Sequence, residues 1–358
     1  MSQNIVPVFP VYFLRGLLKR IFNTIFLCLF LPVFSFAAGN FQKGYEAHLR
    51  GDFSAAIKAW GPLAAQGDAA AQFNIGNLFD FGKGVKEDNV QAAYWYNKSA
   101  EQDNANAQYA LGWMYENGEG VKKDLVKALL WYKKAAEQKH SGAQTNLGWM
   151  YENGKGVEQD YSQAISLYKN AAKNGETNAQ LKLGIIYQNG KVAAEDYSQS
   201  FFWYKKVAEK GDANAQLNLG QMYEYGKGTD ENYTQAVYWY KKAAEQGDTE
   251  AQLNLAVMYK YGTGVNEDSS QAVFWYKKAA EQGNTKAQLN LAVMYASGEG
   301  ILENFVLAYK WANLAAARGN ENAREMKNEV KKRMTRTQIA EAQQLSLEWQ
   351  QIQSGAEN

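Results

Sequence analysis

The residues of this chain that could do chemistry are few and far apart. Two histidines, His48 and His140, occupy non-equivalent places, and the single cysteine, Cys28, lies in an apolar N-terminal stretch. The sequence shows no serine–histidine–aspartate set, no ligand spacing typical of a metal site and no nucleotide-binding loop. We therefore predict that the protein is not an enzyme and that it holds no cofactor and no metal ion.

An evenly spaced column of acidic and amide residues could suggest an array of calcium sites. Its members recur every 36 residues: Asp88, Asp124, Asp160, Asp196, Asn232, Asp268 and Asn304. A Ca²⁺ ion needs six or more oxygen ligands, and each of these residues stands alone. Five of them carry Gln three positions later, which is the capping-box pattern of a helix start. We interpret the column as helix N-caps.

Paired glycines such as Gly118 and Gly120 follow the same period and could cradle a phosphate. No Lys-Ser or Lys-Thr follows them, and they precede no strand-to-helix switch. Glycine at the end of a helix supplies a positive φ without steric cost, so we interpret these pairs as helix ends.

A fixed period of 36 residues therefore organises most of the chain. The dipeptide Ala-Gln marks it, beginning at Ala71, Ala107, Ala143, Ala179, Ala215, Ala251 and Ala287. A period in this range is typical of a solenoid built from one supersecondary unit. Such stacked units form an extended binding surface.

Residues 105–140 illustrate one unit of two helices. In the first helix, predicted over 105–117, Leu111 and Met114 lie on one apolar stripe beside Gly112. A glycine in mid-helix lowers helix stability, so we expect a neighbouring helix to approach closely there. The second helix begins at Asp124 and carries Trp131-Tyr132, a recurring aromatic pair that we assign to the core.

The N-terminus has the layout of a secretory signal. A basic patch (Arg15, Lys19, Arg20) precedes an apolar run over 21–36 and then small residues. We predict a signal peptide over 1–37, so that the protein is periplasmic or secreted. An uncleaved inner-membrane anchor is the alternative. Beyond residue 37 the chain has no cysteine, which excludes disulfides there. The net charge of +1 gives no indication that the protein binds nucleic acid.

The remaining boundaries follow from the repeat. Residues 38–68 form an entry half-repeat, 69–320 form seven repeats, and 321–358 form C-terminal capping helices and a tail. Thr335 and Gln338 make a capping box inside that last segment. Solenoids need polar end units, because these stop further stacking.

These motifs resemble the Sel-one-like repeat (SLR) family of tetratricopeptide-like solenoids. Residues 215–247 meet its pattern almost in full, and the resemblance covers about 41–320. It implies an all-α fold, a right-handed α/α superhelical solenoid of helix-turn-helix repeats of 36 residues. Val192 departs from the pattern in a loop. Asp103 and Lys139 replace the helix-end glycine, so we expect looser or differently shaped turns at those two positions.

The resemblance also implies that the first helix of each repeat, helix A, lines a concave face. We predict Trp113 and Trp149 as anchors for a partner on this face. Amide side chains both donate and accept, so an asparagine ladder could bind an extended backbone. The predicted further contacts are Asn74, Asn117, Asn146, Asn153, Asn218, Asn254, Asn290, Tyr225 and Tyr261. The alternative is that the tryptophans pack against neighbouring repeats and the asparagines only keep the surface polar.

Members of this family are scaffolds and adaptors, so the resemblance implies a protein or peptide partner and no nucleic acid. The leading hypothesis is an exported bacterial adaptor that binds protein through the concave face, with a host factor as one class of partner. The alternative is a periplasmic scaffold for regulation or envelope assembly. A third hypothesis is a penicillin-binding, β-lactamase-like member, although that subgroup carries cysteine pairs that this chain lacks. We expect a monomer without a stable membrane span after cleavage.

Overall fold

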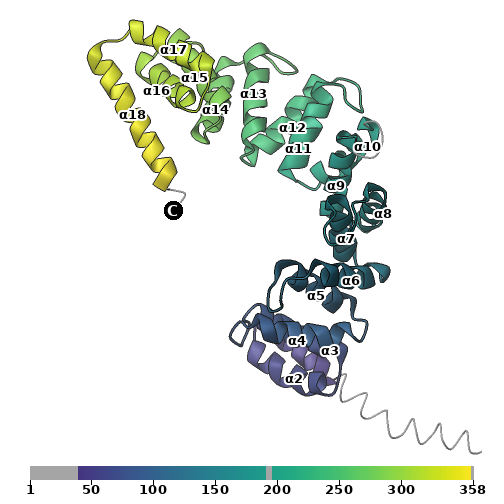
Figure 1. The fold of residues 1–358 in the computed structure, drawn as a ribbon. Helices are drawn as coiled ribbons and strands as arrows, with labels where there is room; N and C mark the ends of the chain where they lie inside the picture. Colours follow the sequence, from purple (N-terminus) through teal and green to yellow (C-terminus); the bar gives the residue numbers. More distant parts are fainter. Residues whose placement is uncertain (1–38, 191–195, 356–358) are drawn as a thin grey trace, which may run out of the picture. The chain divides into compact units, whose positions relative to one another are not determined.

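The computed structural model describes residues 39–190 and 196–355, and within these ranges the regular structure is helical throughout. The predicted signal peptide and Val192 lie outside the described residues. The chain divides into two compact units, residues 1–171 and 172–358. Each unit is built from antiparallel helix pairs that follow one another along the chain (Figure 1).

The entry segment consists of a helix over residues 39–49 and α2 (Phe53–Ala65). The first helices of the seven repeats, helices A, are α3 (Ala69–Asp80), α5 (Ala105–Asn117), α7 (Ser141–Asn153), α9 (Thr177–Gln188), α11 (Ala213–Glu224), α13 (Thr249–Tyr261) and α15 (Thr285–Ser297). The second helices, helices B, are α4 (Asn89–Ala100), α6 (Leu125–Glu137), α8 (Tyr161–Lys173), α10 (Tyr197–Ala208), α12 (Tyr233–Glu245), α14 (Ser269–Glu281) and α16 (Phe305–Ala317).

The acidic and amide column caps helix B, as predicted. In α6, the Asp124 carboxylate accepts hydrogen bonds from the backbone N–H groups of Val126 and Lys127. The same role falls to Asp88, Asp160, Asp196, Asn232, Asp268 and Asn304. These bonds satisfy N–H groups that a helix start otherwise leaves unpaired.

The mid-helix glycines make room for a tyrosine of helix B, which confirms the expected close approach. A Cβ at Gly112 would lie 2.7 Å from the ring of Tyr132, which is fully buried. The same pairing joins Gly220 to Tyr240 in the second unit. The corresponding positions hold Ala256 and Tyr276 in the sixth repeat, and Ala292 and Ala312 in the last.

The two turns that lack a helix-end glycine still have a positive φ. Asp103 has φ 61° and Lys139 has φ 65°, whereas the glycines of this column have φ between 86° at Gly175 and 101° at Gly67. These two turns therefore differ from the glycine turns in φ, as expected, but they keep the left-handed conformation. The reason is that packing of the flanking helices fixes the turn, which outweighs the ~1–2 kcal/mol that a left-handed conformation costs a residue with a Cβ.

The glutamine of each Ala-Gln dipeptide is buried and ties helices together. The Gln108 side chain donates to the carbonyl of Ala100, at the end of the preceding helix B, at 3.1 Å. It also accepts a bond of 2.9 Å from Gln138, at the end of its own repeat. Equivalent glutamine pairs join Gln102 to Gln72, Gln246 to Gln216 and Gln282 to Gln252. The dipeptide that marks the period thus forms a hydrogen-bonded ladder.

The C-terminal segment caps the second unit with α17 (Glu321–Lys332) and α18 (Arg336–Gly355). The predicted capping box is present: Thr335 N–H donates to Gln338 at 2.9 Å, and Gln338 N–H donates to the Thr335 hydroxyl at 3.2 Å. Helix α18 packs against α16, with Trp349 edge-on to Trp311 at 6.3 Å between ring centroids. This helix covers apolar surface that another repeat would otherwise cover.

Candidate functional site

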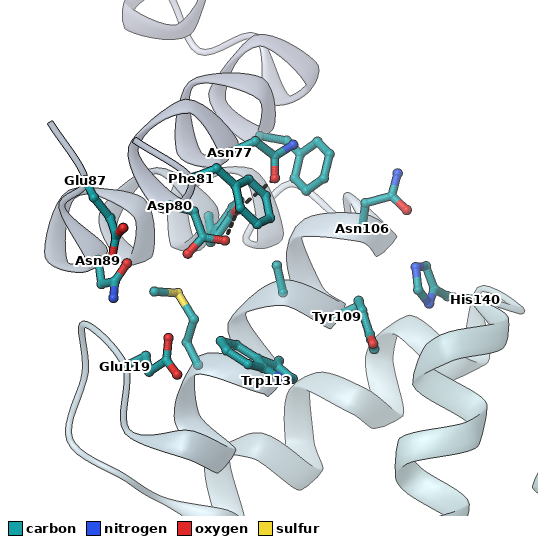
Figure 2. Close-up of a pocket in the computed structure, with 14 residues that line it drawn as sticks. Asn77, Asp80, Phe81, Glu87, Asn89, Asn106, Tyr109, Trp113, Glu119 and His140 are labelled. Carbon is teal, nitrogen blue, oxygen red and sulfur yellow. Dashed lines mark hydrogen bonds between the residues drawn. The ribbon is translucent and has the colours of Figure 1, made fainter. Parts of the chain in front are cut away.

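A pocket of about 560 Å³ opens beside helices α3 and α5 in the first unit (Figure 2). Residues of the first two repeats line it, including His140, which ends the second repeat and caps α7. They are Phe73, Asn77, Asp80, Phe81, Glu87, Asn89, Tyr96, Asn106, Tyr109, Ala110, Trp113, Met114, Glu119 and His140. Helix-A residues on this list define what we call the helix-A face of these repeats.

Two aromatic side chains stand on opposite sides of the opening. Phe81 follows the last turn of α3 and is 63% exposed, while Trp113 lies in α5 and is 38% exposed (Figure 2). Met114, one residue further on, is buried. The pocket therefore has apolar walls that remain in contact with solvent, which is typical of a ligand site and costs free energy unless it is covered.

Carboxylates from three segments gather at one end of the pocket. Asp80 closes α3, Glu87 lies in the loop before α4, and Glu119 lies in the loop after α5 (Figure 2). Asn89, the first residue of α4, lies beside Glu87. No lysine or arginine is among the residues that line the pocket in the described part of the chain.

A buried tyrosine holds Asp80 in place. The Tyr96 hydroxyl is 2.7 Å from Asn77 Oδ1 and 3.0 Å from Asp80 Oδ2, so its single O–H is shared between these two acceptors. Burial raises the pKa of Tyr96 above its ordinary range, so this donor stays protonated. Burial also raises the pKa of Asp80; the Tyr96 bond opposes that rise and the Glu87 carboxylate adds to it. Asp80 thus lies where negative charge is poorly compensated.

His140 has a structural role at the other end of the pocket. Its Nδ1 accepts a hydrogen bond of 3.1 Å from the N–H of Ala143, so it caps α7. Its ring also stacks on Tyr109 at 4.6 Å between centroids. An Nδ1 that accepts a backbone bond leaves the ring proton on Nε2 in the neutral form. This histidine therefore positions the wall of the pocket.

The two predicted tryptophan anchors have different surroundings. Trp113 faces the pocket, whereas Trp149 is half-buried against a core cluster that includes Tyr132 and Met150. In the second unit, Tyr225 and Tyr261 are 62% and 67% exposed.

Several of the predicted asparagines use their amide groups within the fold. Asn117 and Asn153 donate to the carbonyls of Trp113 and Trp149, four residues earlier. Asn146 donates to the Tyr132 hydroxyl at 3.0 Å. Asn218 bonds to Asn214, and Asn254 bonds to Tyr240. Two others, Asn74 and Asn290, are half-buried on helix A.

Sequence reasoning missed a second column of polar contacts. The buried tyrosine of helix B donates to the side chain found 16 residues earlier, in helix A. The pairs are Tyr96 with Asp80, Tyr132 with Glu116, Tyr168 with Glu152, Tyr204 with Gln188 and Tyr240 with Glu224. The recurring acidic residue in that column was the available signal. In the pocket, the Tyr96 bond favours the charged form of Asp80 and so opposes the rise in its pKa caused by burial.

In the described ranges, no group of three or more His, Cys, Asp or Glu side chains is arranged to hold a metal ion. Among the helices that the structure describes, none combines the length and apolar character needed to cross a membrane.

Comparison with known proteins agrees with the repeat architecture. The family model described as "Sel1 repeat" matches seven consecutive segments: 69–104, 105–140, 141–176, 177–212, 213–248, 249–284 and 285–320. Comparison with curated proteins gave no match.

Two solved structures are similar over most of the chain. One is c5321, described as a protective antigen present in uropathogenic Escherichia coli strains and displaying an SLR fold. It is 33% identical, with a TM-score of 0.55, over 82% of this chain and 71% of that chain. The other is a Sel1 repeat protein from Oxalobacter formigenes. It is 32% identical, with a TM-score of 0.62, over 82% of this chain and 87% of that chain.

Proposed function

Because the chain belongs to the Sel1 repeat family, whose members are generally protein-interaction scaffolds, we propose that it is a non-enzymatic adaptor that binds a polypeptide partner on the helix-A face. The partner-binding region centres on Trp113 and the pocket beside it. Two exposed tyrosines of the second unit, Tyr225 at the C-cap of α11 and Tyr261 at the end of α13, are proposed as further contact positions.

One observation carries this proposal: a partly exposed tryptophan lines an apolar recess of about 560 Å³. Tryptophan is enriched among the residues that dominate binding energy at protein interfaces. A recess with aromatic walls and polar groups at its ends has the features of a binding site. Tyr96 and His140 hold the pocket in shape: Tyr96 bonds to Asn77 in its wall, and His140 caps α7 at its edge.

Trp113 is the better anchor of the two predicted tryptophans. Its side chain lines the pocket, whereas Trp149 already contacts the core cluster of its own unit. A side chain that packs against the core has less exposed surface with which to contact a partner. Trp149→Ala is therefore a suitable control, because it removes a tryptophan that does not line the pocket.

We also propose that the protein is exported by the N-terminal segment 1–37 and acts in the periplasm or outside the cell. The basic, apolar and small-residue order of that segment supports export. The similarity to an Escherichia coli protein described as a protective antigen supports a location that a host can reach. A host protein is then one class of partner, and an envelope protein of the producing cell is the other.

The experiment is affinity capture with the chain from residue 38 onward, against a mammalian extract and against the envelope fraction of the producing cell. We expect a specific protein that is retained by the unchanged chain and by Trp149→Ala, and is lost with Trp113→Ala. A protein from the mammalian extract would identify a host-directed adaptor, and one from the envelope fraction a scaffold of the producing cell. Capture that survives Trp113→Ala would contradict the proposed site.

A further inference from the structure

We propose that the pocket between the first two repeats binds a lysine or arginine side chain of the partner polypeptide. This inference rests on the proposed function, because it names the chemistry that the same site recognises.

One end of the pocket is strongly acidic. Asp80, Glu87 and Glu119 come from three different segments and converge on one end of the pocket (Figure 2). Glu87 is exposed, whereas Asp80 and Glu119 are half-buried. The raised pKa of Asp80 arises from burial and in part from the charge of Glu87. A cation placed among these carboxylates would remove that repulsion and gain charge-assisted hydrogen bonds.

The available hydrogen-bonding groups also favour a donor. Asn89 lines the same end of the pocket, and its Oδ1 atom, which lies below the surface, has no hydrogen-bond partner within the protein. Lysine and arginine side chains carry only donors, so they complement an acceptor of this kind. An acidic or carbonyl-bearing side chain would instead meet three carboxylates and one carbonyl oxygen.

Aromatic walls suit the stem and the charge of such a side chain. Phe81 and Trp113 face each other across the opening (Figure 2). An aliphatic stem would cover their apolar surface, and a guanidinium or ammonium group near the ring faces would gain cation–π attraction. Phe81 already makes one cation–π contact, with Lys83 Nζ 5.4 Å from its ring centroid.

The next repeat lacks this chemistry at the equivalent positions. Thirty-six residues further on, Glu87 is replaced by Lys123, and Glu119 is replaced by Lys155. Asn117 stands in place of Phe81. The next repeat pair therefore lacks the acidic, aromatic pocket. In the second unit, Tyr261, Glu267 and Glu299 repeat part of the pattern. There, however, Lys260 stands in place of Asp80 and Val293 in place of Trp113.

The test uses small probes and the chain from residue 38 onward, labelled with 5-fluorotryptophan. Nα-acetyl-arginine methylamide is titrated while the ¹⁹F resonance of Trp113, assigned with Trp113→Phe, is followed. The matched neutral probe is Nα-acetyl-citrulline methylamide, which has the same shape without the charge. Nα-acetyl-lysine methylamide and its Nε-acetylated form make the second matched pair.

We expect the arginine probe to bind roughly tenfold more tightly than the citrulline probe, and this preference to shrink at high salt. The variant Glu87→Lys/Glu119→Lys, which copies the charges of the next repeat, should lose the preference. Glu101→Lys/Glu137→Lys changes two exposed glutamates on helix-B ends and serves as the control of equal charge. Should the first variant fail to fold, Glu87→Gln/Glu119→Gln replaces it.

Equal binding of the charged and neutral probes, or a preference that survives both pocket variants, would overturn the inference. Either result would leave the adaptor proposal standing if capture still depends on Trp113. Conversely, a clear preference for the basic probes would support the inference about the pocket even if no partner were captured. The absence of a captured partner would then count against the adaptor proposal alone.

Discussion

The glutamine ladder makes a prediction about stability that two positions of one unit can test. Gln216 makes two side-chain hydrogen bonds: it donates to the Ala208 carbonyl at 3.1 Å and accepts from Gln246 at 2.7 Å. Gln288 donates to the Ala280 carbonyl at 3.1 Å, but its buried Oε1 has no partner. Both residues are buried, with exposures of 4% and 0%.

Replacing each glutamine by methionine removes the polar group while keeping size and helix propensity similar. Gln216→Met loses two hydrogen bonds, each worth about 1 kcal/mol. Gln288→Met loses one such bond but also removes an unpaired buried acceptor, whose desolvation costs about 1–3 kcal/mol. We therefore expect Gln216→Met to lower the free energy of unfolding by ~2 kcal/mol, and Gln288→Met to leave it unchanged or raise it.

Urea unfolding followed by far-UV circular dichroism measures the difference. The apolar burial gained by methionine is common to both variants and cancels in the comparison. The carbonyls of Ala208 and Ala280 each keep a second bond, from Gly211 and Gly283, so they are matched as well. Equal destabilisation, or a larger loss for Gln288→Met, would refute the view that the ladder bond stabilises the contact between repeats.

Two further predictions concern the tryptophans and the buried tyrosines. Trp113→Ala should lower the free energy of unfolding by about 1 kcal/mol, and Trp149→Ala by ~2 kcal/mol or more, because only Trp149 lies against the core. Urea unfolding measures both losses. A larger loss for Trp113→Ala would contradict the assignment of Trp113 to the pocket and Trp149 to the core. Burial raises the pKa values of the helix-B tyrosines, so these groups stay protonated in the fold. In the unfolded chain they ionise near the ordinary tyrosine pKa of about 10. Stability should therefore fall as pH rises above about 10, by ~1.4 kcal/mol per tyrosine at about pH 11. Tyrosinate absorbance from these residues should appear only with loss of helicity, and its appearance in an intact fold would argue against the burial of Tyr96, Tyr132, Tyr168, Tyr204, Tyr240 and Tyr276.

The repeat architecture could be predicted because one strong signal repeats through the chain. A single unit fixes the N-cap at Asp124, the helix end at Gly118 and the close approach at Gly112. Each of these depends on local backbone geometry or on a neighbour at a fixed sequence distance. Such features are accessible from sequence alone.

The details of the site were less accessible, because they depend on where repeats differ. The conformations of Asp103 and Lys139 are set by packing, which outweighs the preference of those residues. Asn117 satisfies its amide with the carbonyl of Trp113, a local contact that the column pattern does not reveal. The pocket itself combines Glu87 and Glu119, which lie in loops of two different repeats.

The most direct test of the account is site-specific photocrosslinking with benzoylphenylalanine placed on each of the two helix types. Asn106 is exposed in α5 and lines the pocket, whereas Tyr94 is exposed in α4, on helix B of the first repeat. With the mammalian extract or the envelope fraction, the account predicts a discrete crosslinked partner from position 106 that Trp113→Ala abolishes, and none from position 94. A partner that crosslinks from position 94 and not from position 106 would contradict binding on the helix-A face.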